Sequence, residues 1–139
     1  MNVQEVLAKL TGFKTEVEKV LKEVGKMEFN ENDKEENFLN VELMGIISDL
    51  SFACECIDYI NKPVEVKGIL NIKGGKFFID SFELRNNDTV EISNNGYWIK
   101  INILEINGDY YAENLTSLIK ENNNIIGRMR FTKKELEDR

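Results

Sequence analysis

The sequence predicts an α+β protein, with an N-terminal antiparallel helical hairpin followed by a small antiparallel β-barrel. Apolar residues recur with a spacing of seven in the first part of the chain, which is typical of a helix packed against another helix. After Pro63, apolar and polar residues alternate, which indicates strands, and Asn-Gly turn signals lie between them. We therefore expect a helical domain over residues 1–62 and a β domain over residues 63–139.

The first helix is expected over residues 2–27. Two heptad lines run along it, and they correspond to the a and d positions of a coiled-coil seam. The lines are Val3, Leu10, Val17 and Val24, and Val6, Phe13, Val20 and Met27. Gly12 weakens the helix interior by about 1 kcal/mol relative to Ala, so packing must offset that cost.

The second helix is expected over residues 33–61 and completes the hairpin. Asp33 with Glu36 resembles a capping box at its start, and Pro63 biases Lys62 away from helical conformation at its end. The main apolar line alternates by four and three: Leu39, Leu43, Ile46, Leu50, Ala53, Ile57 and Ile60.

The second helix also has apolar residues off this line: Phe38, Val41, Phe52, Cys56 and Tyr59. One partner helix cannot cover both faces, and an apolar face must be buried against another element. Either this face packs on the β domain of the same chain, or two hairpins form a four-helix bundle in a homodimer. The sequence does not choose between them.

Five to seven short strands are expected over residues 64–131, arranged as an antiparallel meander that curls into an SH3-like or OB-like barrel. A long strand over residues 97–106 is followed by an Asn107-Gly108 turn and a returning strand over residues 109–115. Residues 121–124 are expected to form a loop before a last strand. Thr132 with Glu135 predicts a capped final helical turn.

In the long strand, Ile99, Ile101 and Ile103 share one face and are expected in the core, whereas Trp98 and Lys100 share the other. The alternation slips after residue 104, which indicates a bulge or bend. Trp98 on a mixed polar face either covers the helical hairpin or is an anchor for a partner or ligand.

The composition argues against an enzyme. The chain has no histidine, which removes the usual general base and His-based metal sites. Cys54 and Cys56 are poorly placed for a mutual disulfide on a helix, and we interpret them as ordinary thiols. No cofactor or metal is expected. The sequence has neither a signal-peptide pattern nor a run of about 20 apolar residues, so we expect a cytoplasmic protein without a membrane segment.

The net charge of −7 is concentrated in residues 1–62, which carry −6. This acidity favours a protein partner with a basic surface, and nucleic acid is not expected to bind the N-terminal half. The candidate partner-binding residues are Glu31, Asp33, Glu35, Glu36, Trp98 and Tyr111. The candidate phosphate-binding residues are Arg128, Arg130, Lys133 and Lys134, although these cations equally suit a solvated strand edge.

Residues 66–131 resemble a family of small proteins from mobile elements of Gram-positive bacteria, catalogued as a domain of unknown function. The resemblance is carried by VKGILNIKGGKFFID, DTVEIS, GYWIKINILEINGDYYAENL and GRMRF. Within these stretches, the strand start reads Gly75-Lys76-Phe77 where the family has Gly-Arg-Tyr, which is a departure from its pattern, and the I-E-V strand of the family reads Val90-Glu91-Ile92. The resemblance implies a fold and a mobile-element setting, and it implies no activity.

Together these features predict a non-enzymatic protein-binding module of a mobile element. One form of such a module is an anti-CRISPR-type inhibitor that occupies the basic nucleic-acid groove of a host defence protein, such as a Cas effector. The alternatives are a regulatory or structural interaction module of a plasmid or phage, and a small nucleic-acid-binding barrel.

Overall fold

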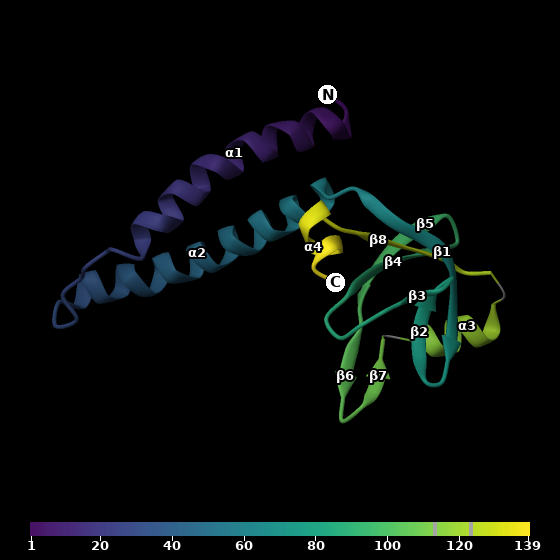
Figure 1. The fold of residues 1–139 in the computed structure, drawn as a ribbon. Helices are drawn as coiled ribbons and strands as arrows, with labels where there is room; N and C mark the ends of the chain where they lie inside the picture. Colours follow the sequence, from purple (N-terminus) through teal and green to yellow (C-terminus); the bar gives the residue numbers. More distant parts are fainter. Residues whose placement is uncertain (113, 123) are drawn as a thin grey trace. The chain divides into compact units, whose positions relative to one another are not determined.

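The computed structural model describes residues 1–112, 114–122 and 124–139. The chain divides into two compact units, Met1–Asn61 and Lys62–Arg139. The first unit is a pair of helices and the second is built around an antiparallel sheet (Figure 1). The predicted α+β class, with a helical pair ahead of an antiparallel sheet, is confirmed.

The two helices are α1, Val3–Val24, and α2, Lys34–Asn61. A capping box starts α1, because the Asn2 side chain accepts from the Glu5 amide at 2.9 Å and Glu5 accepts from the Asn2 amide at 2.8 Å. At α2 the predicted box is only half formed. Asp33 Oδ1 accepts from the amides of the first turn, whereas the Glu36 carboxylate accepts from the Asn30 amide at 2.7 Å.

Polar side chains link the two helices along one side of the hairpin. Lys14 Nζ lies 2.7 Å from Glu18 Oε1 and 2.6 Å from Asp58 Oδ1 across the helix pair. The hydrogen bonds to Asp58 and Glu18 raise the pKa of the Lys14 ammonium above its usual value. Asn61 Nδ2 donates to Thr11 Oγ1 at 2.9 Å. These contacts fix which faces of the helices meet.

The second unit contains a six-stranded antiparallel sheet in the order β3-β2-β1-β8-β4-β5 and a separate β6-β7 hairpin. The strands of the sheet are β1 Val64–Lys73, β2 Lys76–Ile79, β3 Phe82–Glu83, β4 Thr89–Asn94, β5 Tyr97–Asn102 and β8 Ile126–Arg130. The predicted meander is wrong, because β8 from the end of the chain pairs between β1 and β4. Among the described residues no pairing joins β3 to β5, so closure into a barrel is not found.

The segment after β5 differs most from expectation. The small hairpin consists of β6, Leu104–Ile106, and β7, Asp109–Tyr111, and its turn residues Asn107 and Gly108 both have positive φ, as the Asn-Gly signal predicts. The returning strand ends there, and α3, Leu115–Glu121, follows instead. Leu115 is fully buried and, with Leu118 and Ile119, has the spacing of one helix face. Glu113 and Asn123, in the predicted strand and loop, lie outside the described residues.

The core lies on one face of the sheet and includes Ile101 and Ile103. Ile99, expected with them, is 41% exposed because it lies on β5, at the edge of the sheet. The chain leaves the large sheet at Ile103, whose backbone exchanges hydrogen bonds with Asn87 and Asp88. The break that the slipped alternation predicts is therefore present, slightly earlier than expected.

The end of the described chain folds back onto this unit. Helix α4, Lys133–Glu137, has the predicted capping box between Thr132 and Glu135. A hydrogen bond from the Lys62 ammonium lowers the pKa of the Glu135 carboxyl below its usual value. Arg139 donates to both carboxylate oxygens of Asp88 and stacks over Phe82, with its guanidinium carbon 4.5 Å from the ring centroid.

Candidate functional site

The outer face of the sheet, opposite the core, carries a row of charged side chains across four strands. Strand pairing sets Lys67 of β1 beside Arg128 of β8, Arg128 beside Glu91 of β4, and Glu91 beside Lys100 of β5. Arg130 lies two residues further along β8 and so faces the same side. We call these five residues, together with Trp98, the cationic sheet face.

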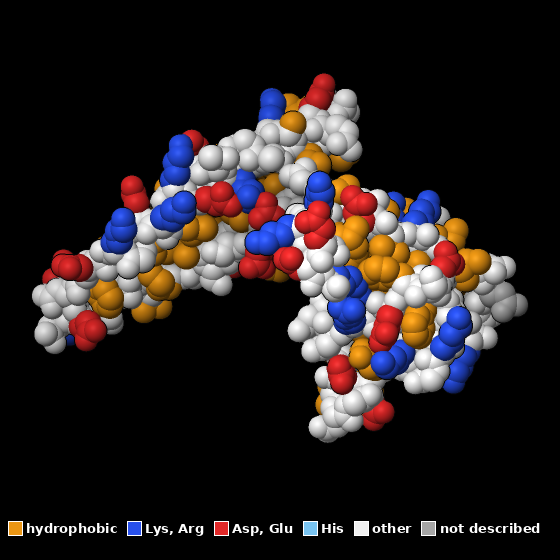
Figure 2. Space-filling view, viewed as in Figure 1, with side chains coloured by type: hydrophobic (Ala, Val, Ile, Leu, Met, Phe, Trp, Pro, Cys, Tyr) orange, Lys and Arg blue, Asp and Glu red, His pale blue; other side chains and the backbone are white. Residues whose placement is uncertain are grey.

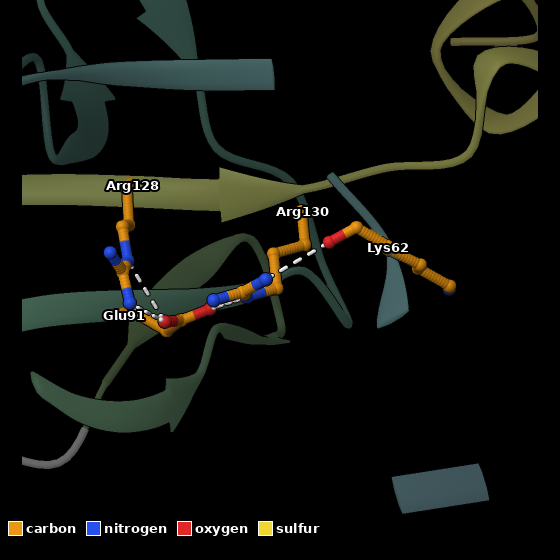
Figure 3. Close-up of polar contacts among 4 residues, drawn as sticks. All are labelled: Lys62, Glu91, Arg128 and Arg130. Atoms are coloured by element: carbon orange, nitrogen blue, oxygen red, sulfur yellow. Dashed lines mark hydrogen bonds and ion pairs between the residues drawn. The ribbon is translucent and has the colours of Figure 1, made fainter. Parts of the chain in front are cut away.

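Glu91 is the centre of this face and is only 6% exposed. Arg128 donates to Oε1 from Nε at 2.9 Å and from Nη2 at 2.7 Å, and Arg130 donates to Oε2 from Nε at 2.6 Å. Arg130 Nη1 also donates to the carbonyl of Lys62 at 3.0 Å (Figure 3). A buried carboxylate is costly unless it is paired and hydrogen-bonded, and here both of its oxygens are paired.

Trp98 packs against the same arginine. The Arg128 guanidinium carbon lies 3.8 Å from the centroid of the indole, within cation–π range, and Lys67 Nζ lies 5.8 Å from it. The side chain of Trp98 is nevertheless 40% exposed. Glu91 therefore orients Arg128, and Arg128 in turn holds an aromatic side chain that remains open to solvent.

The sequence-predicted residues of the β domain are only partly brought together. Trp98, Arg128 and Arg130 share the cationic sheet face, although the two arginines are bound to Glu91 and are not simple solvated charges. Lys133 and Lys134 are exposed on a different element, α4.

Tyr111 belongs to β7 and lines an open hollow of about 480 Å³ with residues of β5, β6 and the following segment. Trp98 is not part of that lining: Lys100, Ile101, Asn102, Leu104, Tyr111 and Ala112. The structure therefore does not place the two aromatic side chains in one site.

Sequence reasoning missed Glu91, Lys67 and Lys100 as members of this site. Each is an ordinary charged residue on an alternating strand, and neither the I-E-V resemblance around Glu91 nor the shared face of Lys100 and Trp98 indicates an ion pair. Alternation does place Lys67, Glu91 and Lys100 each on one face of its own strand, but only the strand pairing shows that these faces are the same.

The helical hairpin carries a second candidate surface. In residues 1–61, all of which are described, Val17 and Cys54 are the buried hydrophobic side chains. The second heptad line of α1 and most of the main apolar line of α2 are exposed, and we call them the apolar hairpin face. Its members are Val6, Phe13, Val20, Met27, Leu39, Leu43, Ile46 and Ile60. Figure 2 shows hydrophobic side chains gathered along the hairpin.

A hollow at the loop end brings together the ends of the two exposed lines. Met27, three residues beyond the end of α1, and Leu39 and Leu43 of α2 all line this hollow of about 180 Å³, together with Phe29. Its remaining lining residues are Glu28, Glu36 and Asn40. The hollow therefore combines an apolar floor with an acidic rim.

The four predicted carboxylates lie around the start of α2, and Glu36 lines this hollow. Glu31 and Asp33 are in the connecting loop, and Glu35 and Glu36 are in the first turn of α2. The positive end of the helix dipole stabilises carboxylates at this position, and Asp33 caps the helix. Their clustering thus has a local structural cause, and it is not by itself evidence of a partner.

In the described part of the chain, no group of three or more Cys, Asp or Glu side chains is arranged to hold a metal ion. None of the described helices combines the length and apolar content of a transmembrane helix. Comparison with protein-family models, curated proteins and solved structures finds no match to this chain. The resemblance of residues 66–131 to a mobile-element family therefore stays a prediction.

Proposed function

We propose that this chain is a protein-binding module, and that the apolar hairpin face binds a basic, amphipathic segment of another protein. The observation that carries the proposal is the exposure of apolar side chains along both helices of a unit whose charge is strongly negative. Large exposed apolar patches bordered by polar residues mark interaction surfaces.

The apolar part of the interaction supplies the affinity. Phe13 is 62% exposed and Ile46 is 54% exposed, and both lie on the apolar hairpin face. Complete burial of such a side chain contributes about 1.5–3 kcal/mol before the costs of association are subtracted. A partner helix with apolar residues at helical spacing fits a face of this kind.

The charged part of the interaction selects the partner. Glu28 and Glu36 border the apolar hollow at the loop end, and residues 1–62 carry a charge of −6. Lys and Arg side chains pack their methylene groups on apolar surface while the cation reaches outward. A basic segment can therefore contact the apolar floor of the hollow and pair with the carboxylates at its rim. The acidic charge also speeds the encounter with a basic partner.

A nucleic-acid-binding groove is one basic surface that fits this chemistry. The proposal therefore includes an anti-CRISPR-type inhibitor that occupies such a groove in a Cas effector, with the resemblance to a mobile-element family as its support. A regulatory interaction module of a plasmid or phage would use the same hairpin face on a different basic protein.

The test measures binding of the full chain to two partners, a designed Leu/Lys amphipathic helical peptide and a Cas effector, at two salt concentrations. Replacing Glu31, Asp33, Glu35 and Glu36 by Gln or Asn preserves the capping oxygen of residue 33 and removes four charges. We expect this variant to bind more weakly and with a flatter salt dependence, because exposed charge attraction is screened within roughly 8–10 Å at physiological salt.

Met27→Gln and Leu39→Gln test the apolar floor separately, and each should weaken binding without changing the salt dependence. A variant with Glu121→Gln and Glu137→Gln, both outside the hairpin, is the control for nonspecific charge loss. Unchanged affinity for both partners in both sets of hairpin variants would refute the proposed function.

A further inference from the structure

The outer face of the sheet, which contains the cationic sheet face, carries two parallel rows of side chains across the same four strands. The first row is Lys67, Arg128, Glu91 and Lys100. The second row is displaced by two residues along each strand. It begins with the Ile69–Ile126 pair and ends with the Ser93–Trp98 pair. Ser93 and Ile126 line one hollow, so the two pairs are adjacent. The rows are therefore about 7 Å apart and each is about 14 Å long, from the ordinary dimensions of a sheet.

We infer that this face binds single-stranded nucleic acid, with phosphates along the charged row and bases against the apolar row. The inference concerns a surface that the proposed hairpin interaction does not use. The surface lies outside the acidic N-terminal half, and its local charge is opposite to the net charge of the chain.

The charged row has the sign that phosphates need, and its two lysines are exposed, whereas the arginines are mostly buried. Lys67, Lys100, Arg128 and Arg130 place four cations around a single carboxylate, and that carboxylate is buried beneath the arginines. Glu65 lies at the irregularity in β1 and so is not part of the regular row. Arg128 uses Nε and Nη2 for Glu91, and within the described chain no acceptor is bonded to its Nη1. A phosphate oxygen is a suitable partner for that group.

The second row has the chemistry that unpaired bases need. Trp98, Ile69 and Ile126 are each at least 40% exposed, so this row offers apolar surface to a ligand. Stacking of bases on aromatic side chains tolerates any base, because every base has a π face. The Arg128 guanidinium already holds the indole by a cation–π contact, so Trp98 is preorganised.

A polar hollow of about 180 Å³ adjoins the second row. Ser93, Asn95, Asn122 and Asn124 contribute to its lining. Amide and hydroxyl groups both donate and accept hydrogen bonds, as base edges require. An acidic peptide would also be attracted by the cations, but its ionised carboxylates only accept hydrogen bonds, whereas base edges also donate them to the amide oxygens of the hollow. These features favour a nucleic acid over an acidic protein as the ligand.

The experiment uses the intrinsic fluorescence of the full chain, because Trp98 is its single tryptophan. Titration with a short oligothymidylate should quench this fluorescence as bases stack on the indole. Trp98→Ala, followed by the anisotropy of a labelled oligonucleotide, should weaken binding about 5- to 150-fold, the range measured for one stacked base. Trp98→Phe should recover part of the affinity.

The charged row is tested by salt dependence. Lys67→Gln should reduce the slope of log K against log salt by about 0.7 between about 50 and 200 mM salt, since one phosphate contact is lost. Lys120→Gln, on α3, removes the same charge from outside the face and should leave the slope unchanged. Circular dichroism confirms that each variant is folded.

Three results would overturn the inference. One is the absence of quenching and of any anisotropy change at low salt. Another is an equal loss of binding in the Lys67 and Lys120 variants. The third is displacement of the oligonucleotide by polyglutamate or duplex DNA as readily as by unlabelled oligothymidylate, since that would show attraction to charge alone.

Discussion

At the scale of single residues, Glu91 organises more of this molecule than any signal in its neighbourhood suggests. Its carboxylate binds two arginines of β8, and one of these holds Trp98. The residue therefore links a buried charge, the pairing of β4 with β8 and the exposed aromatic side chain. The sequence places Glu91 on an alternating strand, but it does not show which cations lie beside it.

We predict that Glu91→Ala lowers the free energy of unfolding by about 3 kcal/mol, since removing one partner of a buried ion pair leaves uncompensated charge. Urea denaturation followed by circular dichroism measures this change. Glu83→Ala is the matched control, because the Glu83–Lys76 pair is exposed on both sides and should contribute less than about 1 kcal/mol. Equal effects of the two substitutions would show that the buried position of Glu91 has no special energetic importance.

At the scale of elements, α1 contains a glycine in its interior that no close contact requires. A Cβ atom built at Gly12 meets nothing within 4 Å, so its backbone freedom serves no packing purpose there. Gly96 is the opposite case, because it lies in the β4–β5 turn with a φ of +83°. One residue type therefore has opposite energetic roles in two elements.

We expect Gly12→Ala to stabilise the hairpin by about 0.5–1 kcal/mol, the usual difference between the two residues inside a helix. Gly96→Ala should instead destabilise the β unit, because the left-handed conformation is costly for a residue with a Cβ atom. Thermal unfolding followed by circular dichroism measures both changes, as a higher Tm for Gly12→Ala and a lower Tm for Gly96→Ala. A Gly12→Ala variant that is less stable than the parent chain would show that this glycine has a role in packing after all.

At the scale of the whole molecule, the apolar hairpin face and the acidic charge of the hairpin favour different partners. A second copy of the chain would cover apolar surface but would bring together two hairpins of like charge. A basic protein would satisfy both features. Because repulsion and attraction between exposed charges are both screened by salt, the two kinds of association respond to salt in opposite directions.

We predict that the isolated chain dimerises at micromolar concentration, and that added salt strengthens this self-association by screening the repulsion. Sedimentation equilibrium at two salt concentrations measures it. A variant with Phe13→Gln and Ile46→Gln, both on the apolar hairpin face, should be monomeric, whereas Tyr97→Gln, an exposed aromatic of β5, should behave as the parent chain does. A mass of 16.1 kDa at all concentrations would contradict the predicted dimer. The apolar hairpin face would then bind only the proposed basic partner.

The sequence by itself determined those features of this protein that depend on near neighbours. The heptad lines predict the helical pair, the alternation after Pro63 predicts antiparallel strands, Asn107-Gly108 predicts a hairpin turn, and Thr132 with Glu135 predicts the cap of α4, all of which are confirmed. The helix at Leu115–Glu121 is not predicted: the expected strand ends at Leu115 and the expected loop begins at Glu121, and a helix of 7 residues has too few apolar positions to show a clear period.

Only the tertiary structure decided which strands are neighbours. Strand β8 pairs between β1 and β4, and this pairing sets Arg128 against both Glu91 and Trp98, far away in sequence. The alternation of a strand specifies which side chains share a face, but pairing between distant strands depends on how the whole sheet buries its core. The cationic sheet face therefore exists only in the folded sheet, where long-range pairing joins side chains that no local pattern connects.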